Sequence, residues 1–179
     1  KNYGTLGIKI GARSTFAYLD GAATTTLKEF FGNGKVNIES NMGEKSSLVY
    51  ANNKAKALLD ADLTIDKGAP AVSTIALLAT NNSSVTVDSG KTLTTNTQVA
   101  LAAVSGSTAE NKGAIVSNRT NNGIGIYAKE AGSEAINDGT ITMNGKEAAG
   151  MYGENGSLIT NDTTGKIEIT TAGEQAMGI

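Results

Sequence analysis

The sequence contains no cysteine and no histidine, and these two absences exclude several classes of protein. Without cysteine there is no disulfide framework and no thiolate ligand for a metal ion. Without histidine the chain lacks the usual general base at neutral pH and the commonest metal ligand. An enzyme built from this sequence would therefore depend on carboxylates, lysine or tyrosine. A chain without cysteine is also compatible with export through a narrow channel.

Charge and aromatic content are low as well. Charged residues make up 18% of the chain, aromatic residues 4%, and the net charge is −2. This balance provides no electrostatic footprint for nucleic acid or an anionic membrane, so we expect neither partner. No apolar run approaches the roughly 20 residues that span a bilayer as a helix. The chain begins at Lys1 without a visible signal peptide and stops inside a repeat, so we expect a fragment of a longer protein.

Glycine is abundant, with 22 residues, and it opens the clearest repeat in the sequence. Gly-Ala-Ile-Val at 113–116 returns as Gly-Thr-Ile-Thr at 139–142 and as Gly-Lys-Ile-Glu at 165–168, in two steps of 26 residues. A second phrase, Gly-Ile-Tyr-Ala at 125–128, returns as Gly-Met-Tyr-Gly at 150–153. A period in the twenties indicates a stacked repeat architecture, because so short a unit cannot bury its apolar side alone.

The clear copies allow weaker copies to be found upstream, each with short alternating runs that are typical of strands. Aliphatic anchors predict the first strand of each unit: Leu6, Val36, Leu63, Leu93, Ile115, Ile141 and Ile167. Larger residues predict a second strand: Tyr18, Tyr50, Leu78, Leu101, Tyr127 and Tyr152. Weaker anchors predict a third: Leu27, Leu58, Val85, Ala109, Ile136 and Leu158.

These strands predict an all-β chain that forms a right-handed parallel β-helix, or solenoid, of about seven coils. Each coil has up to three short strands, and residues 1–179 form a single segment. An antiparallel meander is rejected, because the phrase recurs every three strands and in the same direction. Asparagine and glycine at 121–123 and 144–145 mark corners, since both tolerate positive φ. Residues 24–31 and 54–61 are the least regular, and either could include a short helical turn.

The acidic residues do not suggest a catalytic cluster. Glu168 aligns with Thr142 and Asp138 with Lys112, so neither has an acidic neighbour one coil back, whereas the register of Asp162 is left open. We therefore expect solvated surface charges, no enzymatic activity and no cofactor or metal. The calcium-binding nonapeptide and the phosphate-cradling loop are absent. The alternative from a different class is a polysaccharide-acting β-helix enzyme, such as a lyase, or a phage tailspike segment.

Asparagine recurs at one position of the coil. Asn96, Asn118 and Asn144 each lie three residues after a first-strand anchor, although the next equivalent residue is Thr170. Stacked asparagine side chains can hydrogen-bond along the axis of a stack of strands. The sequence therefore indicates either an asparagine ladder or a set of ordinary turn residues.

The tyrosine column is the candidate binding surface. If Tyr127 and Tyr152 faced outward, they could stack on sugars or anchor a protein partner, so they are the candidate ligand residues. We expect instead that the column is interior or half-buried, with Tyr18 and Tyr50 in the core. Gly125 lies two residues before Tyr127 and is expected to share its face.

Four phrases resemble the passenger repeats of type V autotransporters. They are Gly-Ile-Gly-Ile-Tyr-Ala (123–128), Ala-Ile-Asn-Asp-Gly-Thr-Ile-Thr (135–142), Ala-Ala-Gly-Met-Tyr-Gly (148–153) and Gly-Lys-Ile-Glu-Ile (165–169). They most resemble large fusobacterial outer-membrane adhesins of the RadD kind, closely from about residue 113 onward and more loosely before it.

The resemblance implies a segment at the bacterial cell surface, in the extracellular space, anchored to the outer membrane through a C-terminal β-barrel outside this sequence. The implied function is to extend or display a surface for attachment to other bacteria or to host cells. The implied partner is an unidentified surface protein or glycan, and the fold alone assigns no receptor site to these residues.

Overall fold

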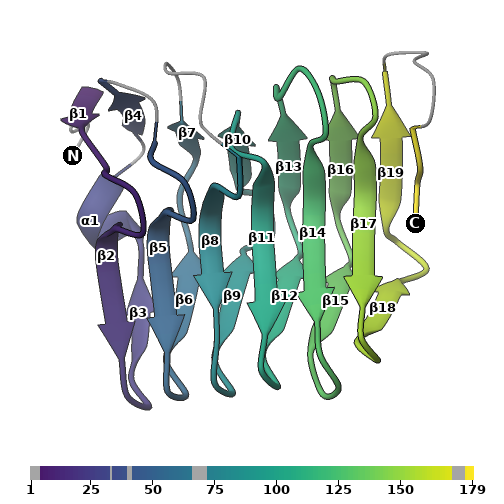
Figure 1. Cartoon of the computed structure of the whole chain (residues 1–179), viewed down its shortest axis with the longest axis horizontal. Helices are drawn as coiled ribbons and strands as arrows, with labels where there is room; N and C mark the ends of the chain where they lie inside the picture. The colour runs from purple at the N-terminus through teal and green to yellow at the C-terminus, as the bar shows by residue number, and fades with distance from the viewer. Residues whose placement is uncertain (1–4, 33, 40–41, 66–71, 171–175) are drawn as a thin grey trace.

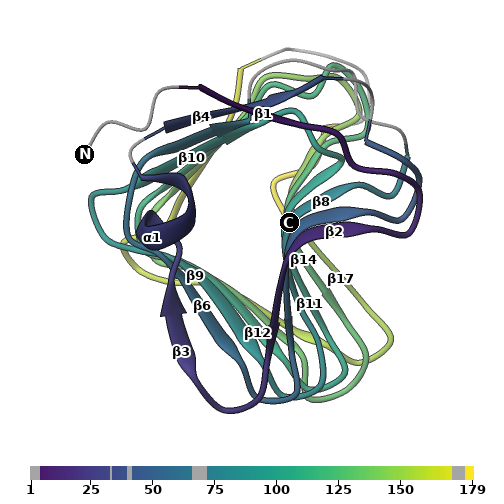
Figure 2. The ribbon, with the colours of Figure 1, turned by 90° about the vertical axis from the view of Figure 1, so that its left-hand side faces the viewer.

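The computed structural model describes residues 5–32, 34–39, 42–65, 72–170 and 176–179, and this part of the chain winds as a parallel β-helix. Each coil contributes one strand to each of three sheets, and equivalent strands of successive coils lie side by side (Figure 1). Viewed from the N-terminal end, the chain runs clockwise as it recedes, so the coil is right-handed (Figure 2). The prediction of a β-helix is confirmed, with about six full coils and the first strand of a seventh.

All neighbouring strands within the three sheets are parallel. Sheet A consists of β1 (Thr5–Ile8), β4 (Gly34–Ile38), β7 (Leu63–Ile65), β10 (Thr92–Thr95), β13 (Ala114–Ser117), β16 (Thr140–Met143) and β19 (Lys166–Ile169). Sheet B consists of β2 (Thr15–Asp20), β5 (Ser47–Asn52), β8 (Ile75–Ala79), β11 (Val99–Val104), β14 (Ile124–Lys129) and β17 (Ala149–Glu154). Sheet C consists of β3 (Thr24–Thr26), β6 (Lys56–Leu59), β9 (Ser84–Val87), β12 (Thr108–Asn111), β15 (Glu134–Asn137) and β18 (Leu158–Asn161).

The described residues include one helix, α1 (Lys28–Phe31), which lies between β3 and β4 at the N-terminal end of the coil (Figure 2). Phe31 is buried and its ring packs 5.9 Å from that of Phe16. Residues 24–31, for which the sequence left a short helical turn possible, therefore contain both a strand and one helical turn. The helical turn that the sequence also allowed within residues 54–61 does not form, because β6 occupies this range and stacks on β9. No helix in the described ranges is both long and apolar enough to cross a membrane.

The first-strand anchors stack as predicted along most of sheet A. Leu6 pairs with Val36, and the later anchors form one continuous column: Leu63, Leu93, Ile115, Ile141 and Ile167. Between β4 and β7 the register is displaced by two residues, so that Val36 pairs with Ile65. A displacement of two keeps every side chain on its original face, because side chains alternate with a period of two.

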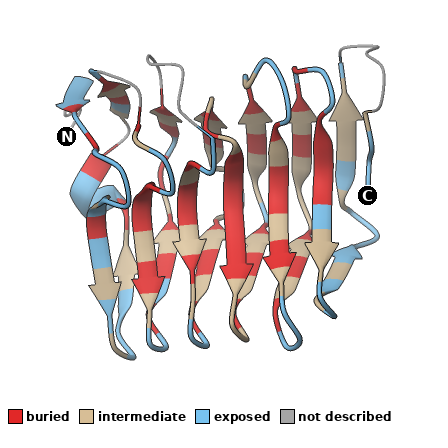
Figure 3. Cartoon of the chain, viewed as in Figure 1, coloured by how far each residue is buried: buried red, intermediate tan, exposed pale blue. Residues whose placement is uncertain are grey.

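The interior of the coil is filled by aliphatic columns. Leu93, Ile115 and Ile141 have no exposed surface, whereas the alternate residues of the same strands, such as Thr94 and Thr140, are half-buried. Buried residues run along the strands, and exposed residues gather at the turns and at the two ends of the stack (Figure 3). Removal of this apolar surface from water, at roughly 25 cal/mol per Å², is the main stabilising contribution.

One second-strand anchor is wrong by a single residue. Leu101 pairs with Leu77 and Ile126 inside the coil, and Ala102 takes its place in the column that contains Tyr127. Both Leu101 and Ala102 are buried, so hydrophobicity alone could not separate the inward residue from the outward one.

The third-strand anchors mix the two faces of sheet C. Leu58 and Ile136 are half-buried on the outer face and Leu158 is 56% exposed, while Ala57 and Ala135 are the buried residues next to them. The inward residues are small alanines and their outward neighbours are large and aliphatic, so the alternation of hydrophobicity does not identify the inner face. An error of one residue then moves an anchor to the other face of the sheet. Val85 and Ala109 are buried within their strands, whereas Leu27 is buried one residue after β3, at the start of α1.

The repeated glycines lie where the chain passes from sheet C to sheet A. A Cβ atom on Gly139 would lie 2.0 Å from the carbonyl oxygen of Gly113, and one on Gly165 would lie 2.2 Å from that of Asn137. No side chain fits at these distances, so glycine is required by the close approach of neighbouring coils. The 26-residue repeat therefore marks a backbone contact.

The predicted asparagine ladder is present between two of its three members, Asn118 and Asn144, at the outer corner after sheet A. Asn144 Nδ2 donates to Asn118 Oδ1 at 2.8 Å, and Thr170 Oγ1 donates to Asn144 Oδ1 at 2.7 Å. Thr170, which breaks the asparagine pattern in the sequence, therefore continues the ladder with its hydroxyl. Asn118 and Asn144 are both exposed.

A second ladder, which the sequence analysis missed, lies inside the coil at the end of sheet C. Asn111 Nδ2 donates to Asn137 Oδ1 at 2.8 Å, and Asn137 Nδ2 donates to Asn161 Oδ1 at 2.8 Å. Asn111 and Asn137 have no exposed surface. The available signal was the spacing Asn-x-Gly at 111–113 and 137–139, which recurs with the coil.

The two ladders predict a difference in stability between matched substitutions. Asn137→Ala should lower the free energy of unfolding by about 1–3 kcal/mol, because it removes both ladder bonds of a buried amide and takes one of its two acceptors from the buried Asn111 Nδ2. Asn144→Ala should cost less than about 0.5 kcal/mol, because water replaces the exposed bond. Urea unfolding of both variants measures the difference, and equal losses would contradict the assignment of buried and exposed ladders.

The inward column of sheet A predicts that Ile141→Asp is strongly destabilising. The substitution leaves an unpaired charge in an apolar interior and should lower the free energy of unfolding by more than about 3 kcal/mol. Thr140→Asp is the control, since Thr140 is half-buried and its partner in the next coil is Lys166. Thermal unfolding is the measurement, and an unchanged transition in Ile141→Asp would refute the assignment of inward and outward faces.

Candidate functional site

Sheet B bends near the start of its strands, and in every strand after β2 the second and third residues are both buried. In β14 these are Gly125 and Ile126: a Cβ atom on Gly125 would lie 2.7 Å from Cγ2 of the core residue Ile141, and Ile126 has no exposed surface. Figure 2 shows the bend, at which sheet B turns sharply and then descends toward sheet C. The expectation that Gly125 and Tyr127 share a face is therefore wrong, because the bend interrupts the alternation between them.

After the bend, the fourth residue of each strand faces outward, and the tyrosines occupy this position. The column consists of Tyr18, Tyr50, Leu78, Ala102, Tyr127 and Tyr152. Tyr18 is 55% exposed and Tyr152 41% exposed, while Tyr50 and Tyr127 are half-buried. The expected core position of Tyr18 and Tyr50 is wrong. The two candidate residues, Tyr127 and Tyr152, lie together on the outer face of the sheet.

The tyrosines form two aromatic pairs with an aliphatic gap between them. Tyr18 and Tyr50 meet edge to face, with ring centroids 5.3 Å apart and an interplanar angle of 82°. Tyr127 and Tyr152 are stacked, with centroids 6.0 Å apart and an angle of 7°. Such pairs contribute about 0.5–1.5 kcal/mol beyond burial, and they fix the orientation of the rings on the surface.

Three tyrosine hydroxyls bond to the residue that lies two positions further along the strand of the next coil. The pairs are Tyr18 with Asn52 (2.9 Å), Tyr50 with Thr80 (3.0 Å) and Tyr127 with Glu154 (2.6 Å). Where the column holds Leu78, the corresponding residue is the apolar Val104. A polar residue is therefore present in the next coil beside each of these three tyrosines, and an apolar one beside Leu78. Sequence reasoning could not detect this, because the pairs are separated by 34, 30 and 27 residues.

The pair formed by Tyr127 and Glu154 has a fixed protonation state at neutral pH. The pKa of Tyr127 is raised from its ordinary value of 10.0, first because partial burial disfavours the phenolate and then because the hydroxyl donates to Glu154. The pKa of Glu154 is lowered, first by that hydrogen bond and then by Lys129, whose Nζ lies 3.1 Å from Oε1. The hydroxyl is therefore a donor and the carboxylate is charged.

These shifts predict how Tyr127→Phe changes stability with pH. The raised pKa of Tyr127 stabilises the fold below pH 10.0 and loses this effect as the pH rises, because the unfolded chain ionises first. The lowered pKa of Glu154 stabilises the fold above its ordinary 4.5 and loses this effect as the pH falls. The difference in unfolding free energy between wild type and Tyr127→Phe should therefore be largest between pH 4.5 and pH 10.0 and should shrink outside this range.

Urea unfolding over a range of pH measures this dependence. In a Glu154→Gln background the acidic limb should disappear, because residue 154 no longer titrates. A difference between the two proteins that does not change with pH would contradict the assigned hydrogen bond.

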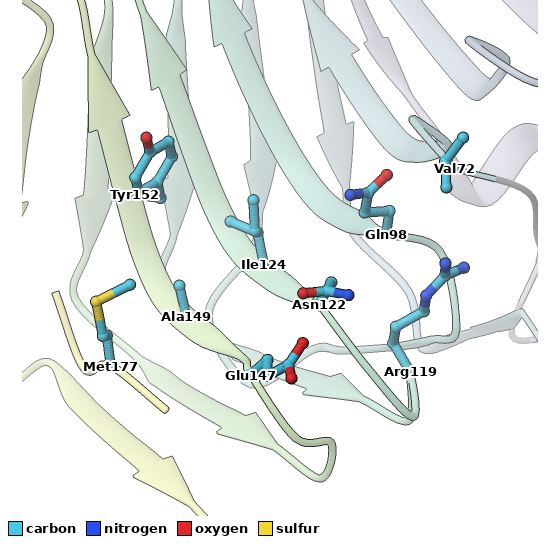
Figure 4. Close-up of a pocket in the computed structure, with 9 residues that line it drawn as sticks. All are labelled: Val72, Gln98, Arg119, Asn122, Ile124, Glu147, Ala149, Tyr152 and Met177. Atoms are coloured by element: carbon cyan, nitrogen blue, oxygen red, sulfur yellow. The ribbon is translucent and has the colours of Figure 1, made fainter. Parts of the chain in front are cut away.

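The bend also creates a hollow of about 310 Å³ on the outer surface beside the tyrosines (Figure 4). Ile124 and Ala149 lie between Tyr152 on one side and the polar residues of the preceding corner on the other. The complete lining comes from several coils: Val72, Gln98, Arg119, Asn122, Ile124, Glu147, Ala149, Tyr152 and Met177. No pattern in the sequence indicates this hollow, because its residues are brought together only by the stacking of coils.

The polar side of the hollow is built by two stacked corners. Asn122 and Glu147 have positive φ values of 55° and 50°, and the bridge between Asn121 and Lys146 holds the two corners together. Arg119 Nε donates to the carbonyl oxygen of Asn121 at 3.2 Å. Partial burial lowers the pKa of the Arg119 guanidinium, because desolvation disfavours its charged form.

One pair of carboxylates does lie on adjacent coils, away from this hollow. Asp138 and Asp162 follow the paired residues Asn137 and Asn161, which resolves the register that the sequence left open. Their carboxyl groups share a hydrogen bond. Burial, followed by the contact with Asp162, raises the pKa of Asp138, whereas the backbone N–H of Thr163 lowers the pKa of Asp162. In the described part of the chain, no three acidic side chains are grouped to hold a metal ion.

The three-sheet right-handed coil, with its aliphatic interior and the tyrosines on its outer face, defines a parallel β-helix domain. The family model described as the BigA third pectate lyase-like domain matches residues 1–165, so the chain belongs to this family. No curated protein and no solved structure matches the chain. The family fits the bacterial β-helical passenger that the sequence phrases implied, whereas the narrower resemblance to RadD-like adhesins stays a prediction.

Proposed function

We propose that this chain is a structural and display segment of a bacterial cell-surface adhesin, with no catalytic role. Membership of the BigA family supports a domain exposed at the bacterial surface. The partner would be a protein or glycan on another bacterium or a host cell. The location would be the outer membrane or the extracellular space.

The observation that carries the proposal is the ordered outer face of sheet B. The register of β2, β5, β8, β11, β14 and β17 aligns the tyrosine column along the coil. Stacked rings and paired hydroxyls hold the side chains in place, so a partner would meet a surface that needs little ordering on binding. Exposed aromatic side chains with a polar tip are enriched at binding surfaces for this reason.

The stack itself supplies the mechanism of display. Each coil pairs its backbone with the next and buries its aliphatic side chains against it, so stability is approximately a sum of contacts between neighbours. A chain of this kind can lengthen without changing its cross-section. Its outer face is therefore presented at a fixed orientation along the whole length.

The absence of cysteine allows a direct test of which face attaches. A polymer would be coupled to Val104→Cys on the outer face of sheet B, or to Thr94→Cys on sheet A as the matched control. Both positions are half-buried and face outward. Beads coated with the uncoupled chain should attach to bacterial or epithelial cells. Coupling at residue 104 should abolish attachment, and coupling at residue 94 should not; failure of the uncoupled beads to attach to any cell would overturn the proposal.

The alternative of a polysaccharide-cleaving enzyme rests on the pair Asp138 and Asp162. We expect that the chain releases no products from polygalacturonate or from neutral polysaccharides, because this pair lies apart from the hollow. Product release is measured beside an active lyase as a positive control. Products that appear with the wild type and disappear with Asp138→Asn would contradict the non-catalytic function.

A further inference from the structure

We propose that the hollow beside Tyr152 binds a neutral oligosaccharide. This inference rests on the proposed display function. It adds the class of ligand that the outer face of sheet B would bind.

The lining combines an apolar floor with planar polar groups. Ile124 is half-buried on the floor and Tyr152 is 41% exposed at its side. Gln98, Asn122 and Arg119 lie on the opposite side of the floor from Tyr152 and bring amide and guanidinium groups (Figure 4). A sugar ring has an apolar face of C–H groups and a rim of hydroxyls, which act as both donors and acceptors. Binding sites with a few placed polar groups above an apolar and aromatic surface are suited to such a molecule.

The charge of the lining favours a neutral ligand. Arg119 and Glu147 bring opposite charges, and the other polar groups of the lining, two amides and the Tyr152 phenol, are uncharged, so the formal charges of the lining cancel. An anionic sugar would be attracted by Arg119 and repelled by Glu147, and a cationic ligand would meet the reverse. Hydroxyl groups can bond to both, because each is a donor and an acceptor.

The backbone under the hollow is already paired, which argues against a peptide that adds as a strand. The N–H groups of both floor residues donate to the preceding coil, Ile124 to Gln98 O (2.7 Å) and Ala149 to Gly123 O (2.8 Å), as does that of Val99 at the same position one coil earlier, to Thr74 O (3.0 Å). Strand addition needs unpaired backbone groups at a sheet edge. The ligand must therefore be recognised by side chains, and the planar polar groups of the lining suit hydroxyls.

The floor beside the tyrosine column has a different composition over the first coils. The floor positions equivalent to Ile124 are Thr15 and Ser47, and their hydroxyls bond to each other at 2.7 Å. Tyr18 thus lies beside a polar floor whose hydroxyl groups already bond to each other. Tyr152, by contrast, lies beside an apolar floor and is held by its stack on Tyr127, so the rings are ordered before a ligand binds.

The test uses the whole chain and a panel of defined oligosaccharides. The neutral probes are hexasaccharides of β-1,4-linked N-acetylglucosamine, β-1,4-linked glucose and α-1,4-linked glucose. The acidic probes are oligogalacturonate and hyaluronan fragments, and an extended peptide of apolar residues represents the other class of partner. Titration calorimetry measures affinity, and circular dichroism with thermal unfolding confirms that each variant is folded.

We expect at least one neutral hexasaccharide to bind the wild type. Tyr152→Ala should weaken this binding by about tenfold or more, which corresponds to about 1.4 kcal/mol. Tyr18→Ala, the matched control in the same column, should leave it unchanged. Tyr152→Phe should retain most of the affinity because the ring remains. Glu147→Gln should not increase binding of the acidic probes above that of the neutral ones.

Three results would overturn the inference: no neutral probe binds, only the acidic probes or the peptide bind, or Tyr152→Ala binds as well as Tyr18→Ala. Attachment of coated beads to cells is measured on the same preparations. It distinguishes failure of the sugar site from failure of the proposed display function. Attachment without sugar binding would refute the sugar site and leave display intact, whereas sugar binding without attachment would refute display.

Discussion

The parallel pairing of each strand with its counterpart one coil away is the constraint on which the rest of this structure depends. It satisfies the backbone polar groups between neighbouring coils and sets the register in which side chains stack. Because the register is retained, a residue meets a residue of the same position above and below it. Columns such as the one that contains Ile115, Ile141 and Ile167 are the direct result, and they provide the apolar interior.

The same constraint explains why polar and small residues recur in columns. A buried amide is costly unless it is bonded, and Asn137 is bonded on both sides by asparagines at its own position. Gly139 recurs for a different reason, since a side chain there would collide with the carbonyl oxygen of Gly113. On the outer face, the partner of Tyr127 is supplied by the following coil. Each coil therefore limits which residues the next one can contain.

The candidate site arises from one departure from regular alternation. The bend in sheet B sends both Gly125 and Ile126 inward, and it leaves Ile124 and Tyr127 on the outside with a recess beside them. Stacked coils then place side chains from separate corners around this recess. A regular flat strand would have put the tyrosines at the same face as the glycines. The bend thus connects the packing of the interior to the outer face of sheet B that carries the tyrosines.

The sequence by itself determined the class of fold, since a glycine phrase with a 26-residue period and short alternating runs is compatible with few architectures. It also indicated the outer ladder at Asn118 and Asn144, because identical residues at one coil position can bond to each other. It did not determine the face of Tyr127, the inner ladder through Asn137, or the hollow beside Tyr152. Those features depend on a bend and on exact register between coils of unequal length, and only the stacked tertiary structure brings residues 24 to 34 positions apart into contact.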